Sequence, residues 1–198
     1  MLKNMILTVI LCFILTPLMY ASDNPSTKQP GDQVDDFSLK GVDGNSYTLS
    51  DMKSSKAVVV IFWSTECPFV QPYRDRVSDM YNNYSKQGVT IWAVNANNTE
   101  SLADVQEHAK KNNYPFPMLK DANNVLADQL GATRTPEVFV IDPNSRIVLY
   151  HGRIDDNREP DKVTSSDLKN ALDDISAGKD IAVKTTKQFG CTIKRIDK

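Results

Sequence analysis

Cys67 and Cys191 are the two residues of this chain whose side chains are best suited to chemistry. Cys67 follows the apolar, β-branched run at residues 57–61 and precedes a segment with the spacing of a helix. At such a strand-to-helix junction, unpaired backbone N–H groups and the helix dipole stabilise a negative charge. Because the thiolate is the nucleophilic form of cysteine, we expect Cys67 to be a redox-active nucleophile.

Cys191 lies close to the C-terminus, and three roles for it are open. It could resolve a sulfenic acid or mixed disulfide formed on Cys67, pair with Cys67 in a resting disulfide, or stay a free thiol. A bond across 191 − 67 = 124 residues would contribute at most about 4–5 kcal/mol in the chain-entropy model. A permanent bond would mask the nucleophile, so we predict a reversible Cys67–Cys191 disulfide.

The pattern of the chain around Cys67 predicts alternating strands and helices. Expected strands cover residues 37–39, 47–49, 58–63, 89–94, 118–119, 137–141 and 147–150, and expected helices cover residues 68–87, 100–112, 125–130 and 166–177. This order predicts an α/β fold, in which a central mixed sheet is flanked by helices. An N-terminal β-hairpin precedes that sheet, and a C-terminal tail follows the last helix.

Two motifs resemble those of a known superfamily. Residues 62–70 read FWSTECPFV and resemble the thioredoxin-like active site, except that Val70 stands where a second cysteine is usual. Residues 134–142 read RTPEVFVID and are similar to a cis-proline segment of exported thioredoxin-like proteins. The chain thus resembles the alkyl hydroperoxide reductase/thiol-specific antioxidant (redoxin) superfamily over residues 32–178. The resemblance is to a secreted branch with one cysteine at the active-site motif.

The resemblance implies roles for residues near Cys67. Pro136 would be a cis-proline facing the cysteine, and the backbone of Thr135 would receive a substrate chain. The remaining substrate-binding candidates come from the same two motifs and are Trp63, Ser64, Pro68 and Arg134. Arg134 could bind substrate, or it could be an ordinary surface arginine exposed to solvent.

The resemblance implies a thiol-dependent oxidoreductase that exchanges disulfides or reduces a small peroxide. The pattern of a peroxidase is incomplete. Peroxiredoxins carry a proline at the position of Val60 and an arginine at the position of Pro136, and this chain has neither. Substrates would be protein thiols, protein disulfides or a small peroxide, with an unidentified reductant. Since the second motif cysteine is missing, a redox-inactive thioredoxin-fold binding module is the alternative.

The two ends of the sequence and its net charge bear on where the protein acts and on what it binds. Residues 1–21 resemble a signal peptide, with Lys3 before an apolar run. They predict a periplasmic or secreted protein without a membrane span after cleavage, and an uncleaved anchor is the alternative. Residues 22–31 are expected to be a flexible leader, and residues 179–198 a tail. The net charge of −2 argues against nucleic-acid binding, and we expect no metal or other cofactor.

Overall fold

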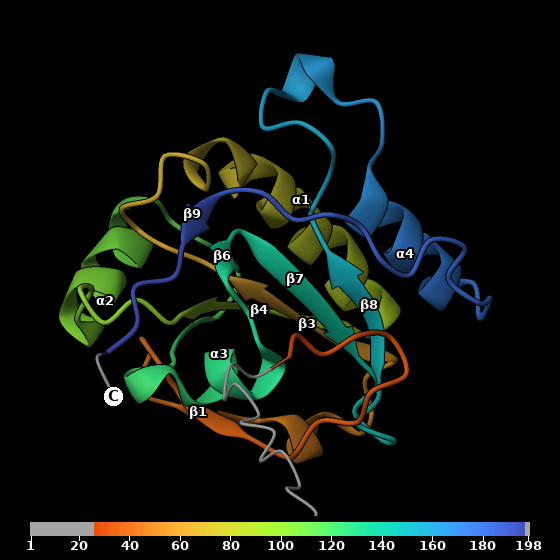
Figure 1. The fold of residues 1–198 in the computed structure, drawn as a ribbon, viewed down its shortest axis with the longest axis horizontal. Coiled ribbons are helices and arrows are strands. Elements are labelled where there is room, and N and C mark those ends of the chain that lie inside the picture. The colour runs from red at the N-terminus through yellow and green to blue at the C-terminus, as the bar shows by residue number, and fades with distance from the viewer. Residues whose placement is uncertain (1–25, 197–198) are drawn as a thin grey trace, which may run out of the picture.

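A seven-stranded mixed sheet forms the centre of the computed structural model, which describes residues 26–196 (Figure 1). Its strand order is β2-β1-β5-β4-β3-β7-β8. The strands are β1 (Ser38–Gly41), β2 (Ser46–Thr48), β3 (Ala57–Phe62), β4 (Val89–Asn95), β5 (Met118–Lys120), β7 (Glu137–Ile141) and β8 (Val148–Gly152). The helices are α1 (Arg74–Tyr84), α2 (Leu102–Lys111), α3 (Val125–Leu130) and α4 (Asp167–Ser176). The predicted α/β class and thioredoxin-like topology are confirmed.

Strand β3 lies in the middle of the sheet and leads directly to Cys67. It pairs in parallel with β4 and antiparallel with β7, and all six of its residues are buried. Alternate side chains enter two apolar cores, as the period of a strand requires. Val59 belongs to the core that also contains buried residues of α1, α2 and α4, whereas Val60 belongs to the core that contains buried residues of α3. A strand buried on both faces gives the following loop a rigid base.

The helix after Cys67 begins later than the sequence predicts. Residues 68–87 were expected to be helical, but α1 begins at Arg74 after a 3₁₀ turn at Gln71–Tyr73. Proline has no N–H group, so Pro72 is tolerated in the 3₁₀ turn that leads into α1 but would interrupt the hydrogen bonds of a helix that began at residue 68. The expectation that Cys67 stands at a helix N-terminus is therefore wrong.

Both ends of the described chain pack against the domain. In the expected leader, Lys28 N donates to Leu130 O at 2.9 Å and Gly31 N donates to Val148 O at 2.9 Å. The C-terminal segment runs from α4 past β8 to a second, two-stranded sheet made of β6 (Arg134–Thr135) and β9 (Cys191–Thr192) (Figure 1). The tail is thus built into the fold around the Cys67 loop.

The predicted signal peptide at residues 1–21 lies outside the described residues. Within residues 26–196, none of the helices has both the length and the apolar character needed to cross a membrane.

Candidate active site

Cys67 and Cys191 form a disulfide, with their Cα atoms 6.1 Å apart. The antiparallel pairing of β6 with β9 brings them together, because it sets Cys191 opposite Thr135. The separation satisfies the limit of about 7 Å for a disulfide. Of the three roles open for Cys191, the structure shows pairing with Cys67.

The peptide bond between Thr135 and Pro136 is cis, as predicted. The Sγ atom of Cys67 lies 3.3 Å from the carbonyl oxygen of Thr135. Cys67, Thr135 and Pro136 are all buried. The structure therefore brings together the three residues on which the sequence-based active-site hypothesis depends.

Ser64 and Glu100 organise the loop that carries Cys67. The Ser64 hydroxyl donates to Glu100 Oε1 at 2.6 Å and accepts the N–H of Cys67 at 3.1 Å. Glu100 Oε2 also accepts the N–H of Thr65 at 2.7 Å and the amide of Asn95 at 2.8 Å. The bond to Ser64 occupies the Cys67 N–H group, so this group is not among the unpaired N–H groups expected at the strand-to-helix junction.

The Glu100 carboxylate is 2% exposed and is the charged centre of this network. Burial by itself raises its pKa, but hydrogen bonds from Ser64, Thr65 and Asn97 oppose burial and leave the pKa below its ordinary value. Glu100 therefore stays ionised at neutral pH. Its position outside both motifs is the reason the sequence analysis missed it.

The other predicted site residues have different surroundings. Trp63 is fully buried and makes edge-to-face contacts with Tyr114 and Phe116, each at 5.9 Å between ring centroids. Pro68 is exposed beside Cys67. Arg134 is also exposed, as its competing interpretation held, and its Nη1 donates to the Gly190 carbonyl at 3.3 Å.

Glu137 is a second buried carboxylate that the sequence analysis missed, although it follows Pro136 directly. Its Oε2 accepts the N–H groups of Thr133 and Arg134, each at 2.8 Å. Its Oε1 lies 2.8 Å from His151 Nε2 and 3.2 Å from the amide nitrogen of Gln188, a tail residue. Glu137 thus joins the cis-proline segment to the tail. A charged residue within an otherwise apolar strand was the available signal.

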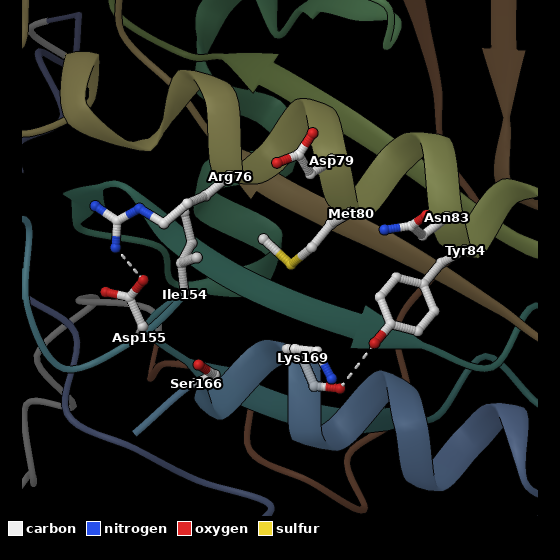
Figure 2. A pocket seen from close by; sticks show the side chains of 9 residues that line it. All are labelled: Arg76, Asp79, Met80, Asn83, Tyr84, Ile154, Asp155, Ser166 and Lys169. Atoms are coloured by element: carbon white, nitrogen blue, oxygen red, sulfur yellow. Dashed lines mark hydrogen bonds and ion pairs between the residues drawn. The ribbon is translucent and has the colours of Figure 1, made fainter. Parts of the chain in front are cut away.

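A cavity of about 190 Å³ lies apart from the disulfide, between α1 and α4. Figure 2 shows Arg76, Met80 and Tyr84 projecting from α1 toward Asp155 and α4. Arg76 forms an ion pair with Asp155. Neither cysteine lines this cavity, so it does not contribute to the disulfide site.

A model of the AhpC/TSA family matches residues 30–150. The chain belongs to this family. The matched range includes Cys67 and Pro136 but ends before Cys191. The AhpC/TSA match therefore covers the cysteine loop and the cis-proline segment, and it carries no information on the role of the tail.

The chain is also similar to individual proteins and solved structures. The chain is 31% identical over 126 residues to the thiol-disulfide oxidoreductase ResA of Halalkalibacterium halodurans, covering 64% of this chain and 70% of ResA. A solved hypothetical protein from Sinorhizobium meliloti is 35% identical, with a TM-score of 0.79 and coverage of 87% and 98% of the two chains. An uncharacterised conserved protein from Geobacillus kaustophilus is 31% identical, with a TM-score of 0.78 and coverage of 85% and 93%.

Proposed function

We propose that this protein is a thiol-disulfide oxidoreductase whose redox-active pair is Cys67 and Cys191. The observation that carries the proposal is the disulfide between them, formed beside the cis-proline segment. The similarity to ResA supports the same reaction class. The pair takes the place of the two neighbouring cysteines of the usual motif, with the second thiol supplied by the tail.

The reaction follows from the chemistry of thiol-disulfide exchange. In the reduced protein, the thiolate of Cys67 attacks one sulfur of a substrate disulfide, whose S–S bond breaks as the other half leaves as a thiolate. The thiolate of Cys191 then attacks Cys67 Sγ and releases the second half. Two electrons pass from the protein dithiol to the substrate, and protons from water neutralise the released thiolates. The reverse steps would oxidise a substrate dithiol.

The residues around the pair support binding of a polypeptide. The Thr135 backbone beside Cys67 would pair with an extended substrate, and exposed Pro68 and Arg134 would contact it from either side. Trp63 supports the loop from the core. We propose protein thiols or disulfides as substrates, and a further thiol as the unidentified reductant.

Peroxide reduction has less support than disulfide exchange. A peroxidase needs donors that stabilise the leaving oxygen next to the nucleophile. The Ser64 hydroxyl already donates to buried Glu100, and Arg134 donates to the tail. Ser64 and Arg134, two of the candidate substrate-binding residues, therefore already have other partners.

We also propose that the protein acts outside the cytoplasm, in the periplasm or after secretion. The apolar run at residues 1–21 and the disulfide both fit an oxidising compartment. N-terminal sequencing of the protein purified from its native host tests the expected cleavage after Ala21. Recovery of the intact N-terminus would favour the anchored alternative.

Reaction of the reduced protein with oxidised glutathione tests the proposed function. The wild type should form the Cys67–Cys191 disulfide and release both glutathione molecules. Cys191→Ser should stop with glutathione bound to Cys67, because no second thiol can release it. If the folded variant forms no mixed disulfide between Cys67 and glutathione, or the wild type forms no Cys67–Cys191 disulfide, the proposed function is wrong, and the binding-module alternative gains support.

A further inference from the structure

The tail occupies the edge of the cis-proline segment where the proposed function places a substrate. Strand β9 pairs antiparallel with β6, with Cys191 opposite Thr135 and Thr192 opposite Arg134. The pairing continues past β9, because the N–H of Ile193 donates to the Thr133 carbonyl at 3.0 Å. An extended peptide that added to this edge with its cysteine at Cys67 would need the same hydrogen-bonding groups.

The residue before Cys191 is under a severe steric limit. Gly190 has a φ of +144°, a conformation that favours glycine. A Cβ atom at this position would lie 2.1 Å from the Thr135 carbonyl oxygen and 3.2 Å from Pro136 Cδ. Since both neighbours belong to the cis-proline segment, the limit comes from that segment and would apply to any chain that follows the same backbone path beside β6.

The second residue after Cys191 enters an apolar site. Ile193 is 3% exposed and belongs to the core cluster that contains Leu126 and Leu130 of α3. A charged side chain at this position would lose its hydration without gaining a partner. The edge of β6 therefore restricts the docked segment at two positions, one on each side of Cys191.

Arg134 contributes a polar contact between those positions. Its Nη1 atom lies 3.3 Å from the Gly190 carbonyl oxygen and 3.3 Å from Thr192 Oγ1. The carbonyl is present in any peptide, whereas the hydroxyl is specific to serine or threonine. This exposed contact adds less to selectivity than the glycine and isoleucine positions do.

We infer that residues 190–193 are an internal copy of the protein's peptide substrate. The external partner is an extended polypeptide with glycine directly before its reacting cysteine and an apolar residue two positions after it. It takes the place of β9 beside β6 when the tail leaves. This inference rests on the proposed function and adds the substrate sequence that the same site would select.

Exchange on a labelled Cys191→Ser variant tests this selectivity. Cys67 is first converted to its mixed disulfide with the coloured thiol thionitrobenzoate, and a reduced peptide with the sequence of residues 188–195, QFGCTIKR, is then added. The peptide thiolate attacks Cys67 Sγ and breaks the S–S bond, which releases thionitrobenzoate as a coloured thiolate. Two analogues carry alanine in place of Gly190 or aspartate in place of Ile193. The exchange rate of each peptide with the labelled protein is divided by the rate at which the same peptide reacts with the free disulfide of thionitrobenzoate.

The parent peptide should react at least about tenfold faster than either analogue, which corresponds to a modest difference in binding free energy. In the Cys191→Ser variant the tail still competes with the added peptide for the edge of β6. The measurement is therefore repeated with a variant that combines Gly190→Ala with Cys191→Ser. The added Cβ weakens docking of the tail, so the parent peptide should react faster with this variant. Circular dichroism shows whether its fold is retained.

Equal normalised rates for all three peptides on both variants would overturn the inference. The proposed function would stand in that case, because exchange at Cys67 would still occur. The proposed function itself would fail if thionitrobenzoate were released from neither folded variant, whether a peptide or glutathione was added.

Discussion

At the scale of single residues, Glu100 has more influence on the Cys67 loop than most residues of the recognised motif. Its carboxylate accepts hydrogen bonds from Ser64, Thr65, Asn95 and Asn97. The neutral amide of a glutamine at this position could not accept hydrogen bonds from all of these donors, because its own NH₂ group would face one of them. Glu100 is thus a positioning residue for the loop.

We predict that Glu100→Gln lowers the free energy of unfolding at pH 7 by about 2–3 kcal/mol, as expected for lost hydrogen bonds to a buried charged group. Folding lowers the pKa of Glu100 from its ordinary value of 4.5. A group with a lowered pKa stabilises the fold above its unfolded pKa, and this contribution is lost as the pH falls through the folded value. The difference between the two proteins should therefore shrink below pH 4.5.

Urea unfolding at several pH values measures this difference. Glu107→Gln makes the same chemical change at an exposed position of α2 and should change stability by less than about 0.5 kcal/mol. A Glu100→Gln protein as stable as the Glu107→Gln control at pH 7 would contradict the role assigned to Glu100.

The surroundings of Cys67 also change the expected behaviour of its thiol. Its N–H group donates to Ser64, α1 starts only at Arg74, and its side chain is 3% exposed. The reduced protein should therefore hold Cys67 mainly as a thiol at neutral pH. Because a stabilised thiolate would favour the reduced form, its absence favours the disulfide.

Alkylation of reduced Cys191→Ser, produced as residues 22–198, with iodoacetamide tests this prediction, since Cys67 is then the only cysteine of that polypeptide. The rate should rise with a midpoint at or above roughly pH 8.5, the value of an unperturbed thiol. A midpoint near pH 6 would show that some other group stabilises the thiolate.

At the scale of elements, the pairing of β6 with β9 depends on a carboxylate from a third strand. Glu137 at the start of β7 orients the N–H groups of Thr133 and Arg134, and it accepts from Gln188 in the tail. The cis-proline segment and the tail therefore share one anchor. Loss of the anchor should loosen both partners of the β6–β9 pair.

We predict that Glu137→Gln lowers the equilibrium constant for forming the Cys67–Cys191 disulfide by about tenfold. The physical reason is that a less ordered tail presents Cys191 to Cys67 at a lower effective concentration. Equilibration with defined mixtures of reduced and oxidised glutathione measures this constant.

Gln188→Ala is the matched control, because it removes the hydrogen bond from the tail and keeps the carboxylate with its backbone partners. Its effect should be smaller than that of Glu137→Gln. Equal effects of the two substitutions would mean that Glu137 acts through Gln188 alone.

At the scale of the whole molecule, the disulfide closes most of the described chain into one loop. It joins two residues that are 124 apart in sequence. The closed loop contains β4, β5, β7 and β8 of the central sheet, whereas β1, β2 and β3 precede it. Further hydrogen bonds hold the tail, including those from His151 N to Lys184 O at 3.0 Å and from Asn98 N to Lys194 O at 2.8 Å. The reduced protein should therefore keep its sheet while the tail becomes easier to release.

Reduction should lower the free energy of unfolding by up to about 4–5 kcal/mol, the chain-entropy value for a loop of this size. Urea unfolding with and without a reductant measures the change, and Cys191→Ser should show no dependence on the reductant. Hydrogen exchange of the reduced protein should become faster at residues 190–193 than in β3, whose amides should speed up only as far as the lower global stability requires. Equal exchange rates at residues 190–193 and in β3 would mean that the tail is released only when the whole fold opens.

The local pattern of residues was sufficient to predict most elements of this protein. The apolar run of β3 and the spacing of α3 and α4 are encoded by neighbouring residues, so their positions were predicted closely. The cis bond before Pro136 was predicted in another way, from the resemblance of residues 134–142 to a family motif. Local pattern misplaced the start of α1, because Pro72 outweighs the apolar spacing.

The fold class, the family and the cysteine that faces the cis-proline could be predicted from the order of residues alone. Pairing of Cys191 with Cys67 was one of three open roles until the folded chain set β9 beside β6. The hold of Glu100 and Glu137 on the two loops could be seen only in the folded chain. Each of these features joins residues far apart along the chain. Helix and strand signals act between neighbours, whereas such contacts depend on how the strands are ordered and how the tail returns across them.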